Sequence, residues 1–257
     1  MTDWPAPAPG AAPLPKMIAA QAGLEVRILF RNGEQLLLTL IIPVLLLVVF
    51  SSESLISVGH GSRIGFIAPG ILALAVLSTS FTSLAIGTAF ERRYGVLKRL
   101  GATPLSRAGL IAAKAALVLT VEAGQVILIV AISFLLGWHP VLTVTSVCSA
   151  LAVLILGSAA FCGLAMLLAG TVRAEAVLAS ANLIYLVLLG IGGVLFPLTK
   201  FPAAARPVLL LLPSGALSDG LRSVLRYGSG VPGKDLLVLA VWAAAAIVLA
   251  ARTFRWE

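Results

Sequence analysis

ERRYGVLKRLGATPLSRAGLIAAK, residues 91–114, is the segment that decides the fold of this chain. It joins two long apolar runs and holds six of the eighteen Lys and Arg residues in a sequence that is 60% hydrophobic. Basic residues in a short loop between apolar runs favour the cytoplasmic side of a membrane. Val96, Leu97 and Leu100 follow helical spacing, which gives a short helix one apolar face that can dock. Gly101 ends this helix, and the next element starts at Thr103-Pro104.

Apolar runs of membrane-spanning length dominate the rest of the chain. A helix needs about 20 apolar residues to cross a bilayer, and only 11% of the residues here are charged. Such a composition is far from that of an ordinary globular protein. We therefore predict an all-α integral membrane protein with six transmembrane helices. The predicted spans are residues 35–56, 66–90, 106–136, 141–170, 176–197 and 234–252.

Two segments precede the first predicted span. Residues 1–15 are rich in Pro and Ala and predict a disordered cytoplasmic tail. They lack the basic start and apolar run of a cleaved signal peptide. Residues 16–34 place Ile18, Ala22 and Val26 on one side and polar residues on an arc, which predicts a helix lying in the membrane interface. Residues 16–257 are expected to form one transmembrane domain.

Polar side chains inside the spans are candidates for a transport path. A lone carboxylate at mid-membrane, such as Glu122, costs about 2.5–3.5 kcal/mol on insertion scales, so it should face the interior, be paired or be protonated. Gln125 lies near it at helical spacing, and Ser80 and Asn182 lie inside two other spans. The alternatives are a structural hydrogen bond at Glu122 and, at Ser80, a hydroxyl bonded to its own helix.

A proline-bounded segment precedes the last span. Residues 207–212 are apolar but far too few to cross a bilayer. With Pro197, Pro202 and Pro213 around them, they predict a re-entrant helical hairpin that dips into the outer leaflet and returns. An amphipathic helix should follow, with Arg222 on its polar side.

Charge fixes the expected sidedness and excludes several functions. With both termini cytoplasmic, twelve of the eighteen basic residues fall on the inner side of a cell membrane. The net charge is +8, but most of the basic residues lie beside apolar spans, where they contact lipid headgroups. We therefore do not expect this chain to bind nucleic acid. The chain has no GxxxxGK[ST] loop, no set of metal-ligand residues and no nucleophile–base pair. We expect no catalysis, cofactor or metal in this chain.

Two stretches resemble the type-2 ABC transporter permeases, a family of drug, polysaccharide and lipid exporters. In the first, Val96-Leu97-Lys98 departs from the family's usual Thr-Leu-Glu after the glycine, so a base replaces an acid. The matching residues there are Glu91-Arg92, Gly95, Leu97, Leu100, Thr103-Pro104, Ser106-Arg107 and Lys114. In the second, they are Phe196-Pro197, Phe201-Pro202, Pro213, Leu221-Arg222 and Gly228.

The resemblance implies a coupling helix that rests on a separate ATPase subunit, with a second cytoplasmic contact near Arg173 and Glu175. It implies two ATPase copies that use ATP and magnesium, and a second permease chain, identical or related. The cargo would be hydrophobic or amphipathic and would usually move outward. The coupling residues are then Glu91, Arg92, Gly95, Val96, Leu97, Leu100, Thr103, Pro104, Arg173 and Glu175.

Other interpretations stay open on the residues alone. The basic segment can be a solvated loop that only fixes topology. The chain can be an ATP-independent carrier or channel with Glu122 as a proton site, in which case transport should follow a pH gradient. It can also be a non-transporting subunit of a membrane assembly or sensor.

Overall fold

The computed structural model of the protein describes residues 10, 12–31, 33–52 and 62–253. Within those ranges the chain is helical and forms no strand, which confirms the all-α prediction. The elements are α1 (Leu14–Arg31), α2 (Gly33–Ser52), α3 (Arg63–Val76), η1 (Leu77–Ser83), α4 (Leu84–Arg93), α5 (Val96–Gly101), α6 (Arg107–Leu135), α7 (Val144–Thr171), α8 (Ala174–Ile191), η2 (Leu198–Lys200), α9 (Arg206–Leu210), α10 (Pro213–Leu225) and α11 (Gly233–Thr253).

Five helical stretches in the described part are long and apolar enough to cross a membrane. They are Arg63–Arg93, Ala108–Leu135, Val144–Thr171, Ala174–Ile191 and Gly233–Thr253. In α2 the apolar stretch Thr39–Ser51 is shorter than these five, and residues 53–56 of the predicted first span lie outside the described ranges. The count of six spans therefore stays a prediction. Residues 1–9 and 11 of the predicted tail also lie outside them, and α1 begins two residues before the expected start.

The second span is one continuous helix with an irregular centre. Arg63–Arg93 runs through α3, η1 and α4 without a break and is buried almost throughout. Its middle, η1, winds as a π-helix. π turns are rare and occur often at functional sites. The helix starts three residues earlier than the sequence predicts, at Arg63.

The fifth span ends six residues earlier than expected, at Ile191. Gly193 follows with φ 69°, in the left-handed region that favours glycine. A Cβ on Gly192 would lie 2.2 Å from Ser214 Oγ, because α10 packs against this turn. The chain therefore leaves the helix before Phe196-Pro197 rather than at it.

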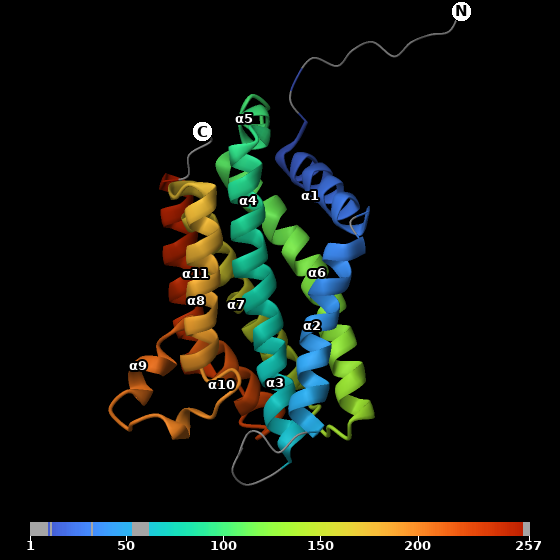
Figure 1. Cartoon of the computed structure of the whole chain (residues 1–257), viewed down its shortest axis with the longest axis vertical. Coiled ribbons are helices and arrows are strands. Elements are labelled where there is room, and N and C mark those ends of the chain that lie inside the picture. The colour runs from blue at the N-terminus through green and yellow to red at the C-terminus, as the bar shows by residue number, and fades with distance from the viewer. Residues whose placement is uncertain (1–9, 11, 32, 53–61, 254–257) are drawn as a thin grey trace, which may run out of the picture.

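Figure 1 shows how the two ends of the bundle differ. The short helix α5, the start of α1 and the end of α11 lie at one end, which we call the α5 end. The short helices of the Pro-rich segment lie at the opposite end. In between, α11 packs beside α7, and α1 packs across α6. The polar cluster described below holds α1 there.

Arg222 lies inside the bundle at the end opposite α5 and binds backbone carbonyl groups there. Its side chain was expected on the polar side of α10, but it is 6% exposed. It donates to the carbonyl oxygens of Val194 at 2.7 Å, Phe66 at 3.3 Å and Gly193. Gly193 and Val194 lie in the turn that follows α8, and Phe66 lies in the first turn of α3. Burial lowers the pKa of Arg222 to about 9, so the guanidinium remains protonated at neutral pH.

The Pro-rich segment forms the compact hairpin η2–α9–α10. Pro213 begins α10, where a proline costs no hydrogen bond. Trp242 of α11 donates its indole N–H to the carbonyl oxygen of Leu211, 2.9 Å away. Pro197 and Pro202 flank η2. How deeply this hairpin enters a membrane stays a prediction.

Candidate functional site

The predicted coupling segment forms an elbow between α4 and α5. Gly95 has φ 72°, a left-handed conformation that ends α4 and lets α5 turn away. Thr103 Oγ1 then donates to the carbonyl oxygen of Leu100 at 2.6 Å and ends α5 before Pro104. The sequence predicted a helix end at Gly101 and a new element at Thr103-Pro104, and α5 does end at Gly101. The break at Gly95 was not predicted.

The elbow exposes a different set of side chains from the one expected. Leu97 is fully buried against its own chain, and Leu100 is partly buried. Tyr94 is 69% exposed and Val96 is 40% exposed. Leu97 thus anchors α5 on the bundle, whereas Tyr94 and Val96 are exposed side chains of the elbow.

The second predicted contact lies directly beside the elbow. Arg93 Nη1 forms an ion pair with Glu175 Oε1 at 2.5 Å, and Arg92 donates to the carbonyl oxygen of Val172. Arg173 is exposed and precedes the first residue of α8. Residues far apart in the sequence therefore meet, and the end of α4 is tied to the start of α8.

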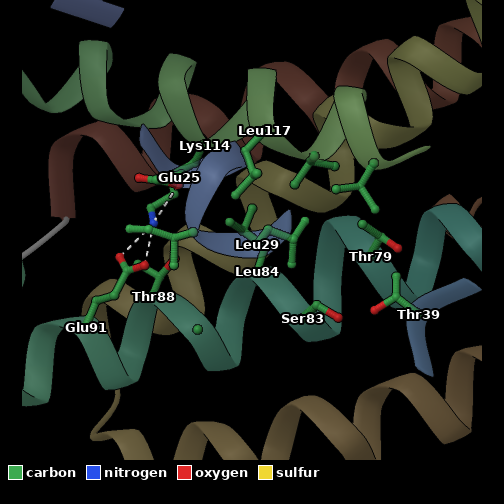
Figure 2. Close-up of a pocket in the computed structure, with 14 residues that line it drawn as sticks. Glu25, Leu29, Thr39, Thr79, Ser83, Leu84, Thr88, Glu91, Lys114 and Leu117 are labelled. Atoms are coloured by element: carbon green, nitrogen blue, oxygen red, sulfur yellow. Dashed lines mark hydrogen bonds and ion pairs between the residues drawn. The ribbon is translucent and has the colours of Figure 1, made fainter. Parts of the chain in front are cut away.

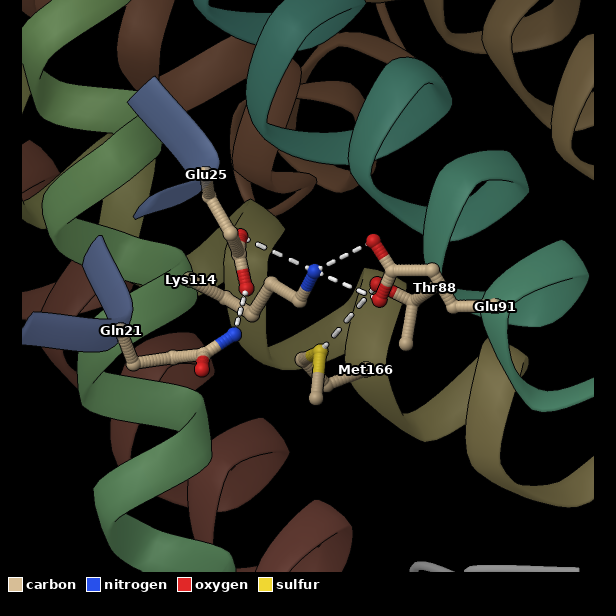
Figure 3. Close-up of polar contacts among 6 residues, drawn as sticks. All are labelled: Gln21, Glu25, Thr88, Glu91, Lys114 and Met166. Carbon is tan, nitrogen blue, oxygen red and sulfur yellow. Dashed lines mark hydrogen bonds and ion pairs between the residues drawn. The ribbon is translucent and has the colours of Figure 1, made fainter. Parts of the chain in front are cut away.

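A buried ionic cluster lies one turn inside the elbow and ties α4 to two more helices (Figure 3). Lys114 Nζ of α6 donates to both carboxylate oxygens of Glu91, at 2.7 and 2.6 Å. It also forms an ion pair with Glu25 Oε2 of α1 at 3.0 Å. Gln21 Nε2 donates to the other Glu25 oxygen at 2.7 Å. Lys114 is 2% exposed and Glu25 is 9% exposed.

Sequence reasoning missed Glu25 as a site residue. It noted a polar arc on the first helix, but an arc of this kind equally fits a helix facing water. Only the crossing of α1 over α6 brings Glu25 to Lys114. The signal that could have found it was a carboxylate in a helix expected to pack near a basic residue of the third span.

A pocket opens next to this cluster and extends along α4 (Figure 2). Its volume is about 230 Å³. Charged groups line one end, leucine side chains the middle, and Thr39 and Thr79 the other end. The lining residues come from α1, α2, η1, α4 and α6: Glu25, Ile28, Leu29, Thr39, Thr79, Ser83, Leu84, Gly87, Thr88, Glu91, Lys114, Leu117, Val118 and Val121.

Three of the four candidate transport-path residues gather inside the bundle. Glu122 is 5% exposed, accepts a hydrogen bond from Ser158 on one oxygen, and has no partner on Oε1. Ser80 lies within hydrogen-bonding reach of Glu122 and donates to its own helix at Val76, 2.5 Å away. Gln125 is 1% exposed and also faces inward.

Gln125 joins three helices. Its Nε2 donates to the Thr39 carbonyl oxygen of α2 at 2.9 Å, and its Oε1 accepts from Thr79 of η1 at 3.0 Å. Asn182 does not join the group: it is exposed on α8 and donates to Leu178 of the same helix at 2.8 Å. In the described ranges no three His, Cys, Asp or Glu side chains gather as metal ligands would.

The five long apolar helices in the described part of the chain define a multi-pass membrane protein. A family model described as "ABC-2 family transporter protein" matches residues 60–252. The chain therefore belongs to the ABC-2 transporter family. No curated protein matches the chain. A permease of this family is a membrane transport component rather than a catalyst, and it usually works with an ABC ATPase.

Proposed function

We propose that the chain is the membrane subunit of an ATP-driven exporter that moves a hydrophobic or amphipathic substrate. Two such subunits, identical or related, would work with two ATPase subunits that bind ATP and magnesium. The α5 end and both termini would face the cytoplasm of a cell membrane crossed six times, with the hairpin η2–α9–α10 entering the outer leaflet. The observation that carries the proposal is the exposed elbow of Tyr94 and Val96, in a chain of this family.

The contacts around the elbow suggest how a push would reach the transport path. Arg93 and Glu175 join α4 to α8, while Glu91 and Lys114 join α4 to α6. Glu25 adds α1 to the same group. A force on α5 would therefore move α1, α4 and α6 together, because the buried Glu25–Lys114–Glu91 contacts lie inside a packed bundle, whereas the exposed Arg93–Glu175 pair is a weaker link to α8. Glu122 and Gln125 lie on α6, so their surroundings would change with it.

The test is co-purification with an ABC ATPase subunit that is co-expressed with this chain. Val96→Asp adds a charge to an exposed apolar contact and should abolish both co-purification and substrate-stimulated ATP hydrolysis. Val231→Asp is the matched control, because Val231 is also exposed, at 64%, but lies two residues before the start of α11, away from the α5 end where α11 finishes. An intact complex in the Val96 variant would overturn the coupling assignment.

The ATP-independent carrier is the second candidate, and the buried Glu122 favours it. Among the described residues no Lys or Arg forms an ion pair with this carboxyl group, and its Oε1 atom has no hydrogen bond. Proteoliposomes containing only this chain separate the two candidates. An exporter subunit gives no transport without ATPase and ATP, whereas a proton-coupled carrier transports when a pH gradient is imposed.

A further inference from the structure

The pocket beside α4 contains a charge that its own described residues do not balance. Its ionisable lining residues are two carboxylates, Glu25 and Glu91, and one ammonium group, Lys114. We propose that this pocket binds an amphipathic cation: an amine carried on a small apolar body. Neither the family match nor the proposed coupling to an ATPase assigns a ligand to it.

The first support is electrostatic. Lys114 and Glu25 are more than nine-tenths buried, so their charges have little contact with water, whereas the Glu91 side chain is 32% exposed and keeps part of its hydration. A buried charge without a counter-charge is costly, and one ammonium group neutralises only one of the two carboxylates. An incoming cation would supply the missing positive charge. An anion would meet an excess of negative charge and be repelled.

The second support is that one ammonium group serves three carboxylate oxygens. Both Glu91 oxygens receive hydrogen bonds from Lys114, and Glu25 Oε1 receives one from Gln21. Glu25 Oε2 is buried, and its ion-pair partner, 3.0 Å away, is the same Lys114 ammonium group. A carboxylate oxygen has two lone pairs, so two carboxylates that share one ammonium group keep spare acceptor capacity. A ligand ammonium group in the pocket would reduce this sharing.

The third support is the shape of the pocket. Leu29, Leu84 and Leu117 line the space between the charged end and the hydroxyl groups of Thr39 and Thr79 (Figure 2). A volume of about 230 Å³ holds a short alkyl or aryl body but not a whole lipid. Gly87 of α4 leaves further room, because a Cβ placed there would have no atom within 4 Å. An apolar body with an amine at one end matches this order of groups.

A ligand in the pocket would change the contacts next to the elbow. Glu91 lies at the charged end of the pocket and precedes the Gly95 turn by four residues. A cation at Glu25 would change the charge balance around the Glu91–Lys114 pair. The ligand would therefore sit where the α1, α4 and α6 helices are joined, and the binding itself needs no ATPase.

The test measures whether an amine protects the pocket from a neutral maleimide. Ser83 lines the pocket and is exposed, so Ser83→Cys supplies the reporter in a protein that also carries Cys148→Ser and Cys162→Ala. The protein is placed in phosphatidylcholine nanodiscs with n-octylamine or n-octanol. We expect octylamine to slow labelling at an about tenfold lower concentration than octanol, as one partly desolvated ion pair would give.

Two further variants separate charge from space. Glu25→Gln should remove the advantage of the amine over the alcohol while leaving the Glu91–Lys114 pair intact. Gly87→Leu should fill the pocket and remove protection by both compounds. A protein keeping only Cys148, an exposed cysteine on α7, controls for reagent access and should label equally with or without octylamine.

Equal protection by octylamine and octanol would overturn the proposal, as would an unchanged amine preference in the Glu25 variant. Phosphatidylethanolamine nanodiscs identify the source of the amine. Slower basal labelling there, reversed by Gly87→Leu, means that a lipid amine occupies the site. Unchanged basal labelling, with octylamine protection retained, means that a free amine does. None of these outcomes depends on the Val96 experiment, so the two proposals fail separately.

Discussion

Replacing Lys114 by Met tests whether the ionic cluster holds α1, α4 and α6 together. Met has a similar length and keeps the apolar stem of the side chain, but it removes the ammonium group. Lys114 is 2% exposed and reaches Glu91 at 2.6 Å and Glu25 at 3.0 Å. The substitution therefore leaves two carboxylates without their shared ammonium group, Glu25 almost fully buried and Glu91 with its side chain 32% exposed.

The expected loss follows from the fate of these carboxylates. Removing one partner of a buried ion pair costs about 3–5 kcal/mol, because the remaining charge is neither paired nor hydrated. Removing all three charges together costs much less, because no charge is left stranded. The triple variant Glu25→Gln, Glu91→Gln, Lys114→Met should regain stability to within about 1–2 kcal/mol of the wild type.

The assay is unfolding of the purified protein in mixed detergent micelles, followed by helical circular dichroism. Lys98→Met is the control, since Lys98 is an exposed residue of α5 at the same end of the bundle. We expect its effect to stay within about 0.5 kcal/mol. Equal losses in the Lys114 and Lys98 variants would refute the reasoning, and so would a triple variant as unstable as Lys114→Met alone.

Three other substitutions test the remaining contacts. Arg222→Met leaves buried carbonyl groups without a donor and should lower the free energy of unfolding by about 3–5 kcal/mol in the same assay. Arg226 is less buried, so Arg226→Met should lower it by less than about 1 kcal/mol. Similar losses in the two variants would contradict the internal role of Arg222. Glu122→Gln should keep ATP-dependent export in vesicles, because the amide oxygen accepts the same serine hydroxyl, and loss of transport by a folded variant would favour the proton carrier. Leu97→Ala removes a fully buried side chain and should cost about 2–5 kcal/mol, whereas Val96→Ala should change thermal unfolding little; a stable Leu97 variant would mean that α5 is not anchored there.

The sequence by itself determined the helical class, and five of its six predicted spans are helices of spanning length in the structure. These features depend on local properties. A run of about 20 apolar residues has to satisfy its own backbone as a helix in lipid. Gly95 was noted only as part of the resembling stretch, and its left-handed conformation, which separates α4 from α5, was found in the structure. The two resembling stretches also identified the family that the match over residues 60–252 shows.

The tertiary structure decided which side of each helix is buried, and this changed the roles of several residues. By its spacing Arg222 fits the polar side of an amphipathic helix. In the structure its side chain is buried, because it donates hydrogen bonds to the carbonyl oxygens of Gly193 and Val194 after the end of α8. Leu97 has the spacing of a docking residue, yet α5 turns it onto its own bundle. Glu25 reaches Lys114 only because α1 crosses α6. Helical periodicity tells which residues share a face, but only packing between distant segments determines what that face meets.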